Sequence, residues 1–152
     1  MVTRQLWVAP IRAKCHDNLM GKTVRQRILV VDDDELTLVV LGLVLKHFGF
    51  EVLKAGSGSV AEAVVAADGA SLALVILDMK MPVMDGEQTF AVLRKLQPDL
   101  PFLLYSGHGS GEAVARLLQS SCCAFLPKTF SMEELQRAIL DLLEQHPRKT
   151  HG

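Results

Sequence analysis

The sequence is poor in aromatic residues, has no excess of charge of one sign, and has no long apolar run. Aromatic residues make up 5% of its 152 residues, so a core must be built mainly from aliphatic side chains. The most apolar segment, residues 36–45, contains Thr37 and Gly42 and is far shorter than the ~18 residues of a membrane span. The net charge of -1 gives no broad attraction to nucleic acid. We expect a globular domain with no membrane insertion and no direct nucleic-acid binding.

Cysteine is also scarce, and its spacing excludes a disulfide framework or a zinc site. The three cysteines are Cys15, Cys122 and Cys123, and the adjacent pair would face opposite sides of a strand. Buried free thiols in a reducing compartment are the simplest interpretation. Residues 7–11 are too short for a secretory leader, because Arg12 interrupts them. These features predict a cytoplasmic location.

Positive charge is concentrated near the N-terminus. Residues 1–27 contain six basic residues against the single acid Asp17. Such a segment is typically a solvated arm. We therefore predict a basic N-terminal extension or linker over residues 1–25, a folded domain over 26–146, and a short tail over 147–152.

Short apolar runs alternate with segments of helical period along the rest of the chain. The apolar runs cover residues 28–31, 51–55, 72–77, 102–105 and 123–126. Runs that are apolar throughout, without alternation, are typical of parallel strands covered on both faces. The pattern predicts an α/β fold of one domain, a doubly wound five-stranded parallel sheet with helices on both faces.

Capping signals mark the expected helices. The first helix should run from Glu35 to Phe48 and end at Gly49. Ser59 and Ser131 each precede a glutamate by three residues, which predicts capping boxes at the second and last helices. Asp85 is placed to cap a third helix that ends near residue 97, and a fourth should cover residues 111–119.

Charged and polar residues follow four of the five predicted strands. They are Asp32-Asp33-Asp34, Asp78, Ser106 and Lys128. In a doubly wound fold, ligands bind at the carboxyl ends of the strands, so these side chains should converge. Several carboxylates without His or Cys favour Mg²⁺. A lysine and a hydroxyl group suit phosphoryl oxygens, so the set predicts phosphoryl chemistry.

These residues resemble the receiver domain of two-component response regulators (CheY-like). The run Ile28-Leu29-Val30-Val31-Asp32-Asp33-Asp34 is similar to the strand and acidic pair that bind the family's metal. Leu77-Asp78-Met79-Lys80-Met81-Pro82-Val83-Met84-Asp85-Gly86 is similar to the phosphoacceptor strand and loop. Ser106 and Lys128 stand where the family has its Ser or Thr and its lysine. The resemblance covers roughly residues 27–145.

The resemblance implies a role for each acid. Asp78 would be the phosphoacceptor that attacks a phosphohistidine. Asp33 would be the main ligand of Mg²⁺, with Asp32, Asp78 and the backbone carbonyl of Lys80 as further ligands. Lys128 would pair with Asp78 or with a phosphoryl oxygen.

The resemblance also implies a switch. Ser106 would donate a hydrogen bond to the phosphoryl group, and Phe125 would change its rotamer as Ser106 moves. Phe125 lacks the hydroxyl group of the more usual tyrosine. The family commonly has proline after the lysine, joined by a cis peptide bond, whereas this chain has Thr129. Because a cis bond to a residue other than proline costs about 3–4 kcal/mol, we expect a trans bond here.

The first helix is apolar around most of its circumference, whereas a helix that covers one sheet face should keep a polar stripe. Our hypothesis is that its outer face docks on a helical partner, either a histidine kinase or phosphotransfer domain or, as a homodimer, a second copy of this chain. The family commonly uses this helix for phosphodonor docking. The downstream protein target is not encoded in any motif.

Two other functions fit part of the pattern. A haloacid-dehalogenase-like phosphatase would use Asp32 as its nucleophile and Asp34 as its acid, but Leu36 stands where such enzymes have Thr or Val. A phosphorylation-independent interaction module could share the same fold. The favoured reading is a signalling switch that catalyses only its own phosphorylation and dephosphorylation.

Overall fold

The computed structural model describes residues 16–17, 23–107 and 111–148. Cys15 and most of the basic residues of the predicted N-terminal extension lie outside these ranges. Within the described part, His16–Asp17 (β1) and Thr23–Val24 (β2) form a short antiparallel pair of their own. None of the described helices is long and apolar enough to cross a membrane.

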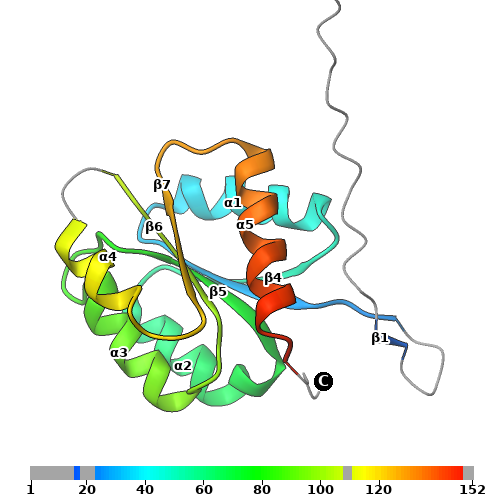
Figure 1. The fold of residues 1–152 in the computed structure, drawn as a ribbon, viewed down its shortest axis with the longest axis horizontal. Helices are drawn as coiled ribbons and strands as arrows, with labels where there is room; N and C mark the ends of the chain where they lie inside the picture. The colour runs from blue at the N-terminus through cyan, green and yellow to red at the C-terminus, as the bar shows by residue number, and fades with distance from the viewer. Residues whose placement is uncertain (1–15, 18–22, 108–110, 149–152) are drawn as a thin grey trace, which may run out of the picture.

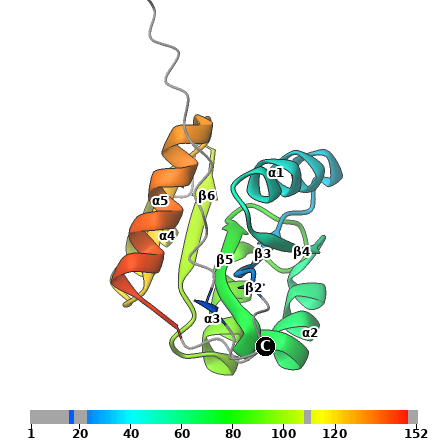
Figure 2. The same ribbon diagram turned by 90° about the vertical axis from the view of Figure 1, so that its right-hand side faces the viewer.

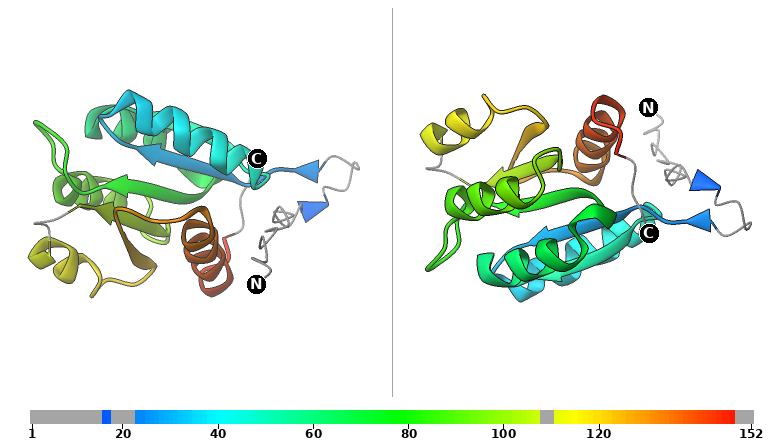
Figure 3. Two further views of the ribbon diagram at one scale, coloured as in Figure 1. Left: turned by 90° about the horizontal axis from the view of Figure 1, so that it is seen from above. Right: turned by 90° about the horizontal axis from the view of Figure 1, so that it is seen from below.

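The predicted parallel sheet is confirmed. Its strands are Arg27–Val31 (β3), Glu51–Ala55 (β4), Leu72–Asp78 (β5), Phe102–Ser106 (β6) and Cys123–Pro127 (β7). They are ordered β4-β3-β5-β6-β7, and every neighbouring pair is parallel. The views in Figure 3 show the arrows of β3 and β5, at the centre of the sheet, running in a common direction. All four carboxyl ends that carry polar residues therefore lie at one edge of the sheet.

Helices cover both faces of the sheet, as the sequence predicts. They are Glu35–His47 (α1), Gly58–Asp68 (α2), Gly86–Leu96 (α3), Gly111–Leu117 (α4) and Met132–Gln145 (α5), with a short 3₁₀ turn at Gly69–Ser71 (η1). Two buried clusters result. One joins α1 and α5 to one sheet face, and the other joins α2, α3 and α4 to the opposite face (Figure 1).

The face covered by α1 and α5 is divided between the two helices. α1 packs on β3 and β4, whereas α5 packs on β6 and β7. Figure 2 shows them on either side of this face, with the strands visible between them. A groove of about 350 Å³ opens between the start of α1 and the loop before α5, and Tyr105 forms part of its lining.

Two of the three helix caps predicted from the sequence are confirmed. Asp85 and Ser131 cap α3 and α5, each in a reciprocal capping box. The box predicted at Ser59 is wrong, because Ser57 caps α2 by accepting a 3.2 Å hydrogen bond from Val60 N. The helix begins early where Gly58 packs closely on α3: a Cβ at Gly58 would lie 2.4 Å from the Thr89 hydroxyl oxygen.

The expectation for the adjacent cysteines is wrong in two respects. β7 begins at Cys123, and Cys122 lies in the preceding turn with a φ of 62°, so the two do not alternate across a strand. Both are half-buried rather than buried. Cys122 Sγ lies 3.1 Å from Nδ1 of His146, a contact that ties the turn to the end of α5.

The loop between β5 and α3 returns so closely that it requires glycine. Gly86 N donates a 3.3 Å hydrogen bond to Met79 O, which brings the first turn of α3 against the end of β5. A Cβ at Gly86 would lie 2.5 Å from the Met79 Cα and 2.8 Å from the Asp78 carbonyl oxygen. These neighbours are backbone atoms, which cannot move aside without shifting Asp78.

We expect Gly86→Ala to lower the free energy of unfolding by about 1–3 kcal/mol, because the added methyl group overpacks the loop. Gly56→Ala is the matched control, since a Cβ there meets nothing within 4 Å, and it should change stability by less than about 0.5 kcal/mol. Urea denaturation of both variants measures the difference. Equal losses of stability in the two variants would show that the backbone at Gly86 can accommodate a Cβ.

Candidate functional site

The predicted site residues meet at the carboxyl edge of the sheet. Asp32 follows β3, Asp78 and Ser106 are the last residues of β5 and β6, and Lys128 follows β7. After β3 the chain continues to β4 on one side of the sheet, and after β5 it continues to β6 on the other side. The strand order therefore reverses between β3 and β5, which is where ligands bind in folds of this kind. Asp32, Asp78 and Ser106 are all buried, with Asp78 only 2% exposed.

Three carboxylates converge there. One oxygen each from Asp32, Asp33 and Asp78 lies within 4.8 Å of the others, and Asp33 is the exposed member. The pKa of Asp78 is raised to about 6, first by burial and then by repulsion from Asp32 and Asp33. A hydrogen bond from the Lys80 backbone and the charge of Lys128 oppose this rise. The geometry and the excess negative charge suit a divalent cation with oxygen ligands.

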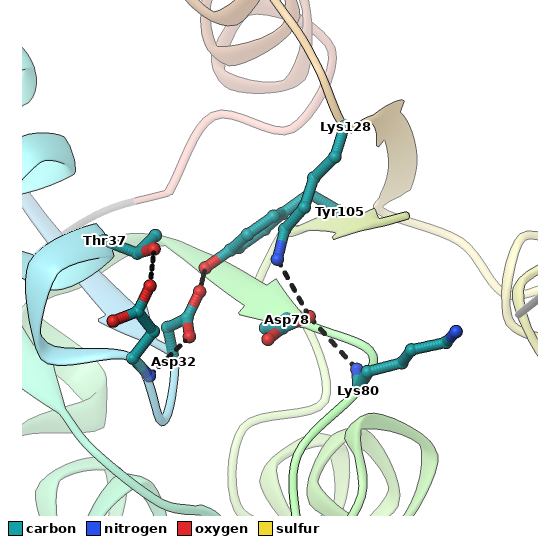
Figure 4. Close-up of polar contacts among 7 residues, drawn as sticks. Asp32, Thr37, Asp78, Lys80, Tyr105 and Lys128 are labelled. Carbon is teal, nitrogen blue, oxygen red and sulfur yellow. Dashed lines mark hydrogen bonds and ion pairs between the residues drawn. The ribbon is translucent and has the colours of Figure 1, made fainter. Parts of the chain in front are cut away.

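Lys128 reaches Asp78 from the loop after β7. Its Nζ lies 3.7 Å from Asp78 Oδ1, and its side chain is partly exposed (Figure 4). The peptide bond between Lys128 and Thr129 is cis, so the expected trans bond is wrong. That expectation considered only the local cost of the bond. In the folded chain, pairing of Lys128 N with Ser106 O at 2.9 Å and the start of α5 fix both sides of the loop.

The loop after Asp78 is tied to the carboxylate through its backbone. Lys80 N donates a 3.1 Å hydrogen bond to Asp78 Oδ1, and Met79 N donates a 3.0 Å bond to Tyr105 O. The side chain of Lys80 extends away from Asp78 (Figure 4). The assignment of the Lys80 carbonyl as a metal ligand stays a prediction.

Asp34, the third acid after β3, caps α1. Its carboxylate accepts hydrogen bonds from Leu36 N at 3.2 Å and from the Thr37 hydroxyl group at 2.8 Å. A negative charge at the N-terminus of a helix is favourable in itself. The Asp34 carboxylate therefore caps the helix and is not one of the three converging acids.

Sequence reasoning missed Tyr105. Its hydroxyl group donates a hydrogen bond to Asp32 Oδ2, and the Lys128 ammonium lies 4.9 Å from its ring centroid. Burial, followed by the bond to Asp32, raises the pKa of Tyr105, so the phenol stays protonated and remains a donor. A buried tyrosine needs a polar partner, and its position next to Ser106 at a strand end could have indicated one.

Of the two predicted switch residues, Ser106 lies at the carboxyl edge of the sheet and Phe125 lies on the sheet face covered by α2, α3 and α4. Phe125 is half-buried and packs against the cluster under α2, α3 and α4. Ser106 is buried at the end of β6, where its carbonyl accepts the bond from Lys128 N. Their coupled movement stays a prediction.

A parallel α/β fold with an acidic group and a lysine at the strand-order reversal defines a class of signalling domains, and comparison with known proteins agrees. Residues 28–140 match the family model of the response regulator receiver domain. The chain belongs to this family. Receiver domains are signalling switches, and this chain is one of them by sequence and fold.

Two individual relatives are a transcriptional regulator and a sensor kinase. The chain is 39% identical over 118 residues to the transcriptional regulatory protein GlrR of Escherichia coli (strain K12), which covers 78% of this chain and 26% of GlrR. It is 30% identical over 118 residues to the sensor kinase CckA of Brucella abortus (strain 2308), which covers 78% of this chain and 12% of CckA. The chain thus spans about a quarter or less of these two relatives.

Solved structures agree on the fold. A response regulator receiver domain protein from Clostridium thermocellum superposes with a TM-score of 0.76 at 27% identity, covering 79% of this chain and 95% of that one. A CheY-like receiver domain protein from Methanospirillum hungatei JF-1 gives 0.75 at 26% identity, covering 81% and 97%.

The raised pKa of Asp78 predicts how stability depends on pH when divalent cations are removed with EDTA. The folded chain keeps the proton on Asp78 up to about pH 6, whereas the unfolded chain loses it near 3.8. Within that window the folded state binds more protons, so the free energy of unfolding should fall as pH rises, by on the order of 1–3 kcal/mol.

Urea titrations from pH 4 to 7 measure this slope, and Asp78→Asn is the control. The variant has no proton to lose at this position, so its curve should be flatter through the same window. Parallel curves for the two proteins would contradict the raised pKa.

Proposed function

We propose that this receiver domain takes a phosphoryl group from a phosphohistidine onto Asp78, with Mg²⁺ held by Asp33, Asp32, Asp78 and the Lys80 carbonyl. The observation that carries the proposal is the placement of Asp78. It is a buried carboxylate with a raised pKa, with two other acids close to it and the Lys128 ammonium 3.7 Å away. A group of this kind is stabilised once a cation and a phosphoryl group complete the charge balance.

The reaction asks for positioning more than for acid–base chemistry. An ionised Asp78 oxygen attacks phosphorus, the bond from phosphorus to the histidine nitrogen breaks, and the nitrogen keeps the electron pair. An aspartyl phosphate and a free imidazole result. Mg²⁺ supplies neutralisation of the charge on the phosphoryl oxygens when it is bound. The chain catalyses only its own phosphorylation and dephosphorylation.

The remaining site residues stabilise and report the modified state. Lys128, already beside Asp78, would pair with a phosphoryl oxygen. The Ser106 hydroxyl group would donate a hydrogen bond to another oxygen, and Phe125 would adjust as Ser106 moves. Because Ser106 and Phe125 lie on adjacent strands β6 and β7, a shift of one is transmitted to the packing of the other.

We propose that the domain occupies residues 26–146 and works in the cytoplasm. The family match over residues 28–140 supports the boundaries. Residues 1–25 and 147–152 would be a basic extension or linker and a tail.

The two rival functions, a phosphatase that uses Asp32 and an interaction module that is never phosphorylated, predict a phosphoryl label on a different residue or no label at all.

Incubation with acetyl phosphate and Mg²⁺ tests the proposal. We expect one phosphoryl group on Asp78, mapped by borohydride trapping and mass spectrometry, with labelling lost in Asp78→Asn and in EDTA. Lys128→Ala should slow labelling by about 10²-fold, because a charge-stabilising contact to the phosphoryl group is removed. A label on Asp32 would favour the phosphatase, and absence of any label would favour the interaction module.

The proposed phosphodonor is a histidine kinase or a histidine phosphotransfer domain that docks on α1. Four apolar residues of this helix are exposed on its outer face: Leu36, Val39, Val40 and Leu43. Leu36 and Val40 also line the groove that leads to Lys128. An apolar surface that borders the phosphoacceptor suits a helical donor, which must bring its histidine to Asp78.

Leu41 lines the same groove but is not among the exposed residues on the outer face of α1. It is 5% exposed and packs in the cluster between α1, α5 and the sheet, so Leu41→Glu would not be a test of docking. A charge at that position would be buried and would unfold the domain.

We expect Val40→Glu to reduce phosphotransfer from a histidine kinase that phosphorylates the wild-type chain by about tenfold or more, since it places a charge in the contact. Labelling by acetyl phosphate, which needs no docking surface, should be unchanged. Val60→Glu on α2 is the matched control, because Val60 is 47% exposed and Val40 is 50% exposed.

Sedimentation velocity on the same variants tests the homodimer. A change of oligomeric size in Val40→Glu alone would assign the surface to a second copy of the chain. Equal phosphotransfer by Val40→Glu and Val60→Glu, with no change in size, would remove the docking role of α1.

A further inference from the structure

Tyr105 is the one tyrosine in the sequence, and it lies between the two oppositely charged halves of the site. It is the second-last residue of β6 and is buried in the cluster under α1 and α5. Figure 4 shows its hydroxyl group directed to Asp32 and the side chain of Lys128 passing across its ring. The ring is itself held by Phe130, whose ring packs edge-on at 88° with a centroid distance of 6.1 Å.

Asp32 is held at both oxygens. Oδ1 accepts a 2.8 Å hydrogen bond from Asp34 N, and Oδ2 accepts the bond from the Tyr105 hydroxyl group. A carboxylate has about four lone-pair positions, so two remain after these bonds. Donors on both oxygens prevent the carboxylate from rotating, and this keeps one oxygen near Asp33 and Asp78. Partners of this kind orient metal ligands in proteins.

The Lys128 side chain has fewer polar contacts than the Asp32 carboxylate. It is partly exposed and makes a 3.7 Å ion pair with Asp78. The face of an aromatic ring attracts an ammonium group, and the Tyr105 ring offers such a face at 4.9 Å. The Tyr105 side chain therefore contacts both Asp32, one of the three converging acids, and the Lys128 ammonium, which pairs with the phosphoacceptor Asp78.

We propose that Tyr105 is a positioning residue with two separable actions: its hydroxyl group fixes Asp32 for Mg²⁺, and its ring holds the Lys128 ammonium over Asp78. This inference rests on the proposed function, since it assigns Tyr105 to the same site. The buried cluster that surrounds the ring is built from aliphatic residues and phenylalanine, which a Phe or Leu at this position would complete equally well. The hydroxyl group is not needed for that packing.

The two actions are separated by two substitutions. Tyr105→Phe removes the hydroxyl group and keeps the ring, so it should weaken Mg²⁺ binding by about tenfold and leave Lys128 in place. Tyr105→Leu removes both, so it should also weaken the binding of beryllofluoride, a phosphoryl analogue, by about tenfold or more at saturating Mg²⁺. Phe50→Leu is the control, because Phe50 is buried in the same cluster and no described hydrogen bond, ion pair or ring contact joins it to Asp32, Tyr105 or Lys128; it should leave both affinities unchanged.

Isothermal titration with Mg²⁺ alone measures the first effect without phosphorylation. The Asp32→Asn background tests whether the hydroxyl group acts through Asp32: there, Tyr105→Phe should cause no further loss of affinity. A merely structural tyrosine predicts a different result, namely a loss of thermal stability that is equal in EDTA and in Mg²⁺, with Mg²⁺ affinity unchanged. That result would overturn the inference.

The single tyrosine provides a direct signal as well. With ¹³Cζ-labelled tyrosine, the wild-type chain should give one resonance that shifts with Mg²⁺ at the concentration found by calorimetry. A resonance that does not move while calorimetry detects binding would contradict the contact with the metal group and leave the proposed function intact. Wild-type chain that binds no Mg²⁺ at all would instead overturn the proposed function, and this inference with it.

Discussion

The carboxylate of Asp78 is held out of water beside two other acids, and most features of the site follow from the need to balance that charge. Burial and the neighbouring Asp32 and Asp33 raise its pKa to about 6, while Lys128 at 3.7 Å offsets part of the cost. The parallel sheet makes this possible, because it brings the carboxyl ends of β3, β5 and β7 to one edge. The imbalance that remains is what suits a divalent cation and a phosphoryl group.

The surroundings of Asp78 are fixed by close backbone contacts rather than by its own side chain. Gly86 lets α3 begin against the end of β5, and Lys80 N donates to the carboxylate from the loop between them. On the other side, Tyr105 links Asp32 to Lys128 across β6. The groove beside Tyr105 continues to the exposed apolar residues of α1, so the reacting group and the proposed docking surface are adjacent.

Local patterns in the sequence were sufficient for the elements and for the list of site residues. Continuous apolar runs such as residues 72–77 indicated buried parallel strands, and Asp85 and Ser131 were recognised as caps from their spacing alone. The α2 cap was misplaced because Ser57 and Ser59 both carry a hydroxyl group near the helix start. Only the packing of Gly58 on Thr89 selects the earlier one.

The sequence by itself determined the doubly wound parallel fold, the converging acids and the lysine, because strand ends in a parallel sheet meet at one edge whatever the details of packing. It could not determine what depends on contacts between distant residues. Tyr105 and Asp32 are 73 positions apart, and their hydrogen bond exists only because β3 and β6 lie on either side of β5. The cis bond at Lys128 and the separation of buried Leu41 from exposed Val40 were likewise decided by the folded chain, since each depends on neighbours that no local pattern contains.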